Sequence, residues 1–188
     1  MPRLSDLLDA DWARLGELSG ASTQLRKFRH AFSPRFASVT LIRLSQALHS
    51  SGWVRLAKLS ALINFVLFGI EVPPRMPIGP GLVLMHTHGT VLGAASIGSN
   101  VTIYQQVTLG AREMDFVYTL SQRPIIEDGV VIGAGAKVLG GLKLGTECKI
   151  GANAVVLKDV PARHLAVGVP ARIIAVSPKR DISTSLEA

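Results

Sequence analysis

His86 and His88, two histidines separated by one residue, are the side chains of this chain best suited to acid–base chemistry. The 188-residue sequence holds five histidines, and the others are His30, His49 and His164. An imidazole titrates near neutral pH, so it can take a proton from a hydroxyl group during group transfer. A His-x-His pair can also ligate a metal ion, but no third ligand is evident beside it, and no metal is expected.

The segment that must position these histidines has aliphatic residues that recur every six positions over residues 71–160. One set of aliphatic residues is Ile126, Ile132, Val138, Leu144, Ile150 and Val156, and a second inward set is Val130, Ala136, Leu142, Cys148, Ala154 and Val160. This period fits neither an α-helix nor a simple alternating strand. It is typical of hexapeptide repeats, of which three make one coil of a parallel β-helix.

The period breaks twice upstream of this block. Earlier inward sets are Val72, Ile78 and Leu84, followed by Val91, Ile97, Ile103 and Leu109, with Gly89 and Ala95 among their partners. The step from Leu84 to Val91 is seven residues, so one extra residue is accommodated near His86. The step from Leu109 to Ile126 is 17 residues, which predicts an inserted loop over 111–124. Loops that interrupt a rigid repeat commonly carry function.

Composition and charge limit the classes of protein to consider. The sequence is 48% hydrophobic with a mean hydropathy of +0.36, which is enough for a substantial core. A single cysteine excludes a disulfide within the chain, and the N-terminus lacks the order of a signal peptide. The net charge of +7 suits an anionic partner, but aromatic residues are too few, at 5%, for a typical nucleic-acid surface. We expect a cytoplasmic protein that does not bind nucleic acid.

Three regions are expected: an N-terminal helical region over 1–69, a β-helix domain over 70–176 and a flexible tail over 177–188. Ser5 is expected to cap a first helix that stops near Gly16 to Gly20, and two more helices are expected over about 36–50 and 53–68. A final strand over 169–174 would close the β-helix.

The last expected helix has one apolar face, formed by Trp53, Leu56, Leu59 and Ile63, with Arg55 and Lys58 at its edge. Between Ser19 and Ile70 the sequence has seven basic residues and no acidic one. Such a face commonly packs on the rest of the protein or on a neighbouring subunit. The alternative is a weak contact with an anionic membrane surface.

Several segments of the repeat region resemble the serine acetyltransferases. They are Glu71-Val-Pro-Pro, Gly81-Leu-Val-Leu-Met-His86-Thr-His-Gly89, Val107-Thr-Leu-Gly110, Gly133-Ala-Gly-Ala-Lys-Val-Leu-Gly140 and Gly168-Val-Pro-Ala-Arg172. This family belongs to the hexapeptide-repeat acyltransferases, and the resemblance covers residues 70–174. It implies a mainly β fold, a left-handed parallel β-helix, following the N-terminal helical region.

The resemblance also implies acetyl transfer from acetyl-CoA to a hydroxyl group, with His86 as the general base. Glu71 falls where the family has the acid that pairs with this histidine, and it would stabilise the imidazolium that forms. The backbone N–H groups of Gly110 and Ala111 are expected to stabilise the oxyanion of the tetrahedral intermediate.

Acetyl-CoA is expected to lie in a groove between two β-helices of a homotrimer, as in the family. Ala134 and Ala152 are small enough for its pantetheine arm to approach the backbone. Lys149 and Arg172 are candidates for its phosphates, with Lys137 as a further candidate. For each lysine, an ordinary solvated surface charge is the alternative interpretation.

The acceptor side departs from the family at several positions. The family has an aspartate immediately before the catalytic histidine, where this chain has Met85, and an Arg-His pair where it has Gln122 and Arg123. These residues, with His88, are expected to line the acceptor pocket. Loss of a carboxylate that would pair with an amino group argues against a free amino acid. The first hypothesis is therefore a sugar hydroxyl in cell-surface polysaccharide synthesis. The alternatives are serine O-acetyltransferase and a non-catalytic trimeric scaffold.

Overall fold

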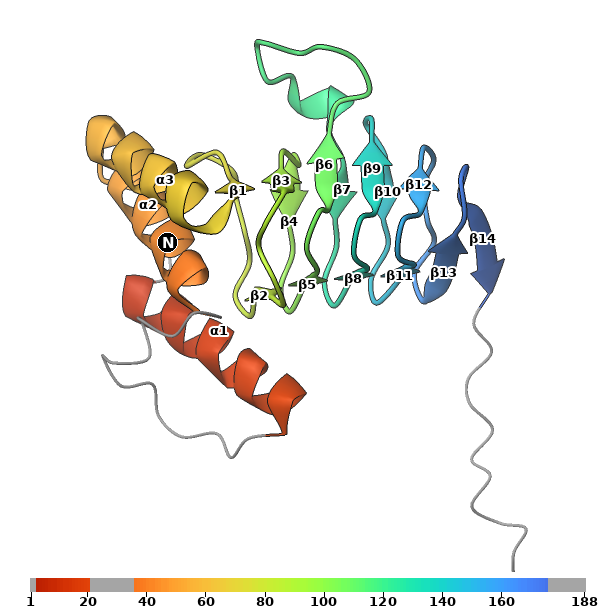
Figure 1. The fold of residues 1–188 in the computed structure, drawn as a ribbon, viewed down its shortest axis with the longest axis horizontal. Coiled ribbons are helices and arrows are strands. Elements are labelled where there is room, and N and C mark those ends of the chain that lie inside the picture. The colour runs from red at the N-terminus through yellow and green to blue at the C-terminus, as the bar shows by residue number, and fades with distance from the viewer. Residues whose placement is uncertain (1–2, 21–35, 176–188) are drawn as a thin grey trace, which may run out of the picture.

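The computed structural model describes residues 3–20 and 36–175, in which helices are followed by a stack of short strands (Figure 1). The helices are α1 (Leu4–Ser19), α2 (Ala37–Ser50) and α3 (Val54–Phe68), and a 3-10 helix, η2, spans Leu120–Gln122. The strands are β1 (Ile70–Glu71), β2 (Val83–Leu84), β3 (Thr90–Leu92), β4 (Ser96–Ile97), β5 (Thr102–Ile103), β6 (Thr108–Gly110), β7 (Ile125–Ile126), β8 (Val131–Ile132), β9 (Lys137–Leu139), β10 (Lys143–Leu144), β11 (Lys149–Ile150), β12 (Val155–Val156), β13 (His164–Val167) and β14 (Arg172–Ala175). The predicted tail over 177–188 lies outside the described residues.

The strands form three sheets, and successive strands visit the sheets in turn. Sheet A has the order β1-β3-β6-β9-β12, sheet B β10-β7-β4, and sheet C β14-β13-β11-β8-β5-β2. Ile126 pairs with Leu144, and Ile132 with Ile150, so one coil takes eighteen residues there. The predicted parallel β-helix is confirmed. At its C-terminal end, β14 pairs with β13 in the antiparallel direction.

The aliphatic row of the repeat fills the interior of the β-helix, where every member from Ile126 to Val156 is at most 3% exposed. The prediction of Val91 as an inward residue is wrong. Leu92 is buried instead and pairs with Leu109, and Thr90 and Ala94 replace Gly89 and Ala95 as the buried neighbours. Relative to the six-residue period, the turn before β3 holds two extra residues and the turn after β3 holds one fewer.

The three helices agree with the predicted ones, except at the start of α1. That helix begins after Arg3 without a side-chain cap, and the predicted cap, Ser5, bonds instead to the carboxylate of Asp6. Gly20 and Gly69 end α1 and α3 in the left-handed conformation, which glycine adopts without a steric cost. In the described part of the chain, no helix is long and apolar enough to cross a membrane.

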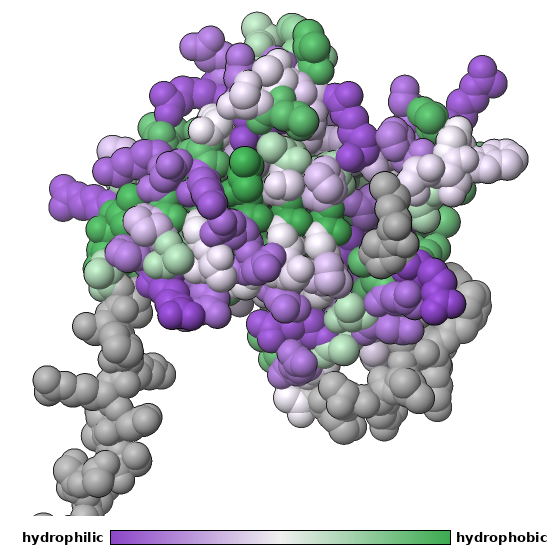
Figure 2. Space-filling view, turned by 180° about the vertical axis from the view of Figure 1, so that it is seen from behind, coloured by the Kyte–Doolittle hydropathy of each residue, from purple (hydrophilic) through white to green (hydrophobic). Residues whose placement is uncertain are grey.

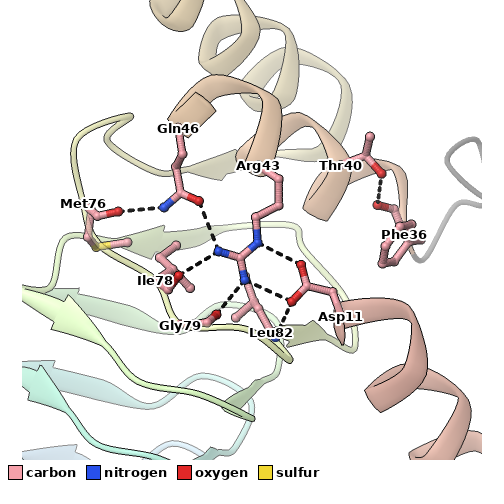
Figure 3. A network of polar contacts seen from close by, with 9 residues as sticks. All are labelled: Asp11, Phe36, Thr40, Arg43, Gln46, Met76, Ile78, Gly79 and Leu82. Carbon is pink, nitrogen blue, oxygen red and sulfur yellow. Dashed lines mark hydrogen bonds and ion pairs between the residues drawn. The ribbon is translucent and has the colours of Figure 1, made fainter. Parts of the chain in front are cut away.

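A buried ion pair joins α1 and α2 to the first coil of the β-helix (Figure 3). The side chains of Arg43 and Asp11 are both fully buried, and two hydrogen bonds of 2.8 and 3.0 Å link them. Arg43 also donates to the carbonyl oxygens of Ile78 and Gly79, while Asp11 accepts from the backbone N–H of Leu82. This network fixes the helices against the end of the β-helix that holds β1 and β2.

Candidate active site

The turn that follows β2 holds Met85, His86 and His88 at the edge where the chain passes from sheet C to sheet A. Both histidines are exposed, and Met85 is half-buried. The backbone N–H of Gly89 donates to the carbonyl of Gly69 at 2.9 Å, so the turn packs under the end of α3. A β carbon at Gly69 would lie 3.3 Å from Cδ2 of His88, so glycine there leaves room for this imidazole.

The turns that follow the strands of sheet C stack above one another. Ala134 follows β8 and Ala152 follows β11, and the N–H of Asn153 donates to the carbonyl of Ala134 at 2.8 Å. Strands are spaced by about 4.8 Å, so Ala152 lies roughly 14 Å along this edge from the turn of His86. The residues proposed for proton transfer and for the pantetheine arm therefore share one edge, which we call the base edge.

Glu71 lies on the exposed face of β1, paired in register with Val91 of β3. Among the described residues, no hydrogen bond or ion pair joins it to His86. The predicted acid–base pair stays a prediction. Within the described ranges, no group of three or more His, Cys, Asp or Glu residues could hold a metal ion.

The residues predicted for the oxyanion and much of the acceptor pocket lie at another edge, between sheets A and B. Gly110 ends β6, and the loop over 111–124 follows it and projects from the β-helix (Figure 1). This loop contacts the turn after β3, because Arg123 donates to the carbonyl of Gly93 at 3.0 Å. The turn of His86 precedes β3, so sheet A separates it from Gly110, Ala111, Gln122 and Arg123. One chain does not bring the two halves of the predicted site together.

Arg123, predicted to bind the acceptor, is engaged within its own loop. Its Nη2 lies 2.9 Å from Oδ2 of Asp115, and its guanidinium stacks 3.6 Å from the ring centroid of Tyr118. Arg75 lies 4.4 Å from the same centroid, and the Tyr118 hydroxyl donates to the carbonyl of Ala94 at 2.8 Å. Sequence reasoning missed this role, because nothing in a loop sequence pairs residues eight positions apart. We call Arg75, Asp115, Tyr118 and Arg123 the loop cluster.

The electrostatics of the loop cluster favour the charged form of its carboxylate. Burial acts to raise the pKa of Asp115, but hydrogen bonds from Thr119 and Arg123, and the charge of Arg123, hold it below its usual value. Burial also raises the pKa of Tyr118, so its hydroxyl stays protonated. Met114, Phe116 and Val117 of this loop are exposed, and Phe116 is 93% exposed. The loop as a whole is the projection at the top of Figure 2.

The cations predicted to bind acetyl-CoA lie on the sheets, away from the loop. Lys149 on β11 and Arg172 on β14 are both exposed on strands of sheet C. Lys137 on β9 donates through Nζ to the carbonyl of Gln106. Cys148 is buried, and burial, together with the charge of Glu127, raises the pKa of its thiol to about 12. The thiol is therefore protonated at neutral pH and is not a candidate nucleophile.

Comparison with known proteins places this arrangement in a family. Residues 123–158 match the bacterial transferase hexapeptide (six repeats) family. A serine acetyltransferase of Helicobacter pylori is 43% identical over 143 residues, which make up 75% of this chain and 81% of the relative. This chain belongs to the serine acetyltransferase family.

Two further matches define the extent of the similarity. A serine acetyltransferase of Mycobacterium tuberculosis is 42% identical over 136 residues, and this chain spans 58% of its length. A solved serine acetyltransferase in complex with CoA has a TM-score of 0.78 and 32% identity, over 91% of this chain and 69% of that one. The predicted family and left-handed β-helix fold are confirmed. These relatives are named for serine as their acceptor, so they give no support to the first hypothesis of a sugar hydroxyl in polysaccharide synthesis.

Membership in this family gives the loop cluster a testable consequence. We expect Asp115→Asn to raise the KM for the acceptor about tenfold, because the loop loses a hydrogen-bonded charge pair, while kcat changes little. Steady-state kinetics of acetyl transfer would measure both constants. Glu113→Gln, an exposed carboxylate of the same loop, is the matched control and should leave both unchanged. Equal KM values for the two variants would contradict a positioning role for the cluster.

Proposed function

We propose that this protein is an acetyl-CoA-dependent O-acetyltransferase whose acceptor is L-serine. The observation that carries the proposal is the base edge, where the exposed imidazole of His86 lies in line with the small residues Ala134 and Ala152. The family relationship supports both the donor and the acceptor. Catalysis on this edge needs no covalent enzyme intermediate, because base and donor can lie side by side.

In the proposed reaction, His86 removes the proton of the serine hydroxyl as its oxygen attacks the thioester carbonyl of acetyl-CoA. The tetrahedral oxyanion accepts hydrogen bonds from the N–H groups of Gly110 and Ala111 contributed by a neighbouring copy of the chain. Its collapse breaks the C–S bond and returns the proton from the imidazolium to the departing thiolate of CoA. In this mechanism Glu71 pairs with His86 and stabilises the imidazolium until the proton is returned.

We further propose a homotrimer in which one site draws on two chains. Sheet A separates the base edge from Gly110 and the loop over 111–124 in a single chain, so neither half is complete alone. In a closed ring, one chain presents one patch and its neighbour presents a different one. The base edge of one subunit then faces the loop of the next, and Lys149 and Arg172 flank the groove between them for the phosphates of CoA.

The direct test follows thiol release from acetyl-CoA with L-serine, with nucleotide sugars or glycans, and without an acceptor. Turnover with serine well above the rate without an acceptor supports the proposal. Turnover with a sugar alone would replace serine by the second candidate below. Absence of turnover with any acceptor would favour a non-catalytic scaffold.

The second candidate acceptor is a sugar hydroxyl, and Met85 favours it. This thioether cannot pair with the ammonium group of an amino acid, and the guanidinium of Arg123 is already occupied by Asp115. Met85→Asp distinguishes the two acceptors. We expect it to raise kcat/KM for serine about tenfold, because it adds a charged partner for the ammonium group. No gain for serine, together with turnover of a sugar by the unchanged protein, would favour the sugar.

A further inference from the structure

Helix α3 is packed with its small and polar residues inward and its apolar residues outward. Its buried residues are Ala57, Ser60 and Asn64. Ser60 donates to the carbonyl of Leu41 at 3.0 Å and Asn64 to that of Ser38 at 3.2 Å, so this narrow polar strip faces α2. The apolar face, predicted to pack on the rest of the protein or on a neighbouring subunit, is therefore left exposed within the single chain. This is the reverse of the pattern of an ordinary surface helix.

The exposed apolar side chains form one continuous surface. After Val54 in the first turn they are Leu56, Leu59, Leu62, Ile63, Phe65, Val66 and Leu67, and we call these seven the outer face of α3. Leu59, Leu62 and Val66 follow helical spacing along its centre, and Val66 is 70% exposed. A contiguous apolar surface of this kind on a folded protein marks an interaction site.

Both charged residues of α3 itself, Arg55 and Lys58, are positive. Arg55 lies one turn before Leu59 in the same central row, and Lys58 lies at its border. Over the described residues 36–70 there is no Asp or Glu, and neither cation forms a hydrogen bond or ion pair with a described residue. Trp53, 63% exposed, lies at the start of the helix, where an amphipathic ring suits the boundary between water and lipid.

These features favour a lipid surface over a face-to-face contact between two copies of the chain, and a contact with a different patch of a neighbouring subunit is the outcome that light scattering would detect. Two outer faces packed together would enclose Arg55 and Lys58 beside like charges, with no carboxylate on either face to pair with them. At a bilayer, the same side chains extend their aliphatic stems toward lipid phosphates while the apolar row enters the acyl boundary. We propose that the outer face of α3 lies on an anionic membrane surface.

Flotation of the purified full-length chain with lipid vesicles tests this proposal. We expect binding to vesicles of 70% phosphatidylcholine and 30% phosphatidylglycerol, and little binding to phosphatidylcholine alone. Leu59→Gln/Leu62→Gln/Val66→Gln should abolish binding, because it removes the centre of the apolar row. Arg55→Gln/Lys58→Gln should weaken binding to anionic vesicles by about fivefold for each charge removed.

A charge-matched control is Lys158→Gln/Arg163→Gln, which removes two exposed cations near the other end of the β-helix. It should bind anionic vesicles as the unchanged chain does. Equal loss in this variant would show general charge attraction and overturn the proposal. Absence of vesicle binding by the unchanged chain would also overturn the proposal. A smaller assembly of the triple variant in light scattering would overturn it as well, because it would show that the outer face of α3 contacts another subunit.

Fluorescence of Trp53 gives a second measurement that does not depend on the triple variant folding. Anionic vesicles should shift its emission to shorter wavelength, and brominated acyl chains should quench it. Trp53→Phe should remove the shift, since Trp12, the second tryptophan, lies on α1 and is partly buried against Phe36. An unchanged spectrum on addition of vesicles would overturn the proposal.

Discussion

Replacing His86 by alanine should lower the rate of acetyl transfer by about 10²–10⁴-fold, the usual contribution of one general base. The side chain is exposed on the base edge, so its removal opens no cavity and should leave the melting temperature unchanged. The loss should appear in kcat more than in the KM for acetyl-CoA, because a base acts in the transition state. Stopped-time assays of thiol release with purified protein would measure it.

His164→Asn provides the matched control, because His164 bonds only to a backbone carbonyl two residues away and lies outside the candidate site. Its rate should equal that of the unchanged chain. The rate of His88→Ala should lie between the rates of His86→Ala and His164→Asn, because His88 packs beside Gly69 and is predicted to line the acceptor pocket. A His86→Ala variant that retains more than about a tenth of the activity would remove His86 from the role of base.

The largest effect on stability should come from breaking the buried ion pair of α1 and α2. Asp11→Ala leaves the guanidinium of Arg43 buried without its counter-charge, which costs about 3–5 kcal/mol in the free energy of unfolding. For a chain of this length each kcal/mol shifts the melting temperature by roughly 2–4 °C, so a fall of about 10 °C is expected. Thermal unfolding followed by circular dichroism would measure it.

Two further variants separate the ion pair from a general effect of charge. Glu17→Ala removes an exposed partner of Arg14 in the same helix and should cost less than about 1 kcal/mol. Asp11→Leu/Arg43→Met removes both charges and should recover part of the loss. Recovery stays incomplete because Leu82, Ile78 and Gly79 lose hydrogen bonds. A shift below 2 °C for Asp11→Ala would show that the pair is not needed.

The sequence predicts most of the β-helix, because each coil repeats the same constraint on its inward positions. It fails at the first break, where Leu92 rather than Val91 turns inward. Both residues are aliphatic, so the pattern cannot tell which of them faces the core. The choice depends on how many residues the turn after Met85 uses, and that follows from the packing of this turn beneath Gly69 at the end of α3.

The candidate site was less predictable, because its halves are joined by contacts that leave no periodic trace. His86 stands out through its position at a break in the repeat. Nothing in the sequence pairs Asp115 with Arg123, since a loop has no fixed geometry from which to read a contact. Likewise, Leu59 is exposed because Ser60 and Asn64 are the residues of α3 that pack against α2. This arrangement reverses the rule that apolar side chains are buried.

The two ends of the β-helix decide how copies of this chain can associate. A ladder of parallel strands exposes unpaired backbone groups at each end, and a strand of another molecule can add to them and begin a fibre. Here β14 runs against the direction of β13 at one end, and α3 packs against β1 at the other. A further coil therefore meets a reversed strand at the end of sheet C and a helix beside the first strand of sheet A, so it cannot simply continue the parallel ladder. The sides of the rod, where the base edge and the loop lie, have no such cover in the single chain.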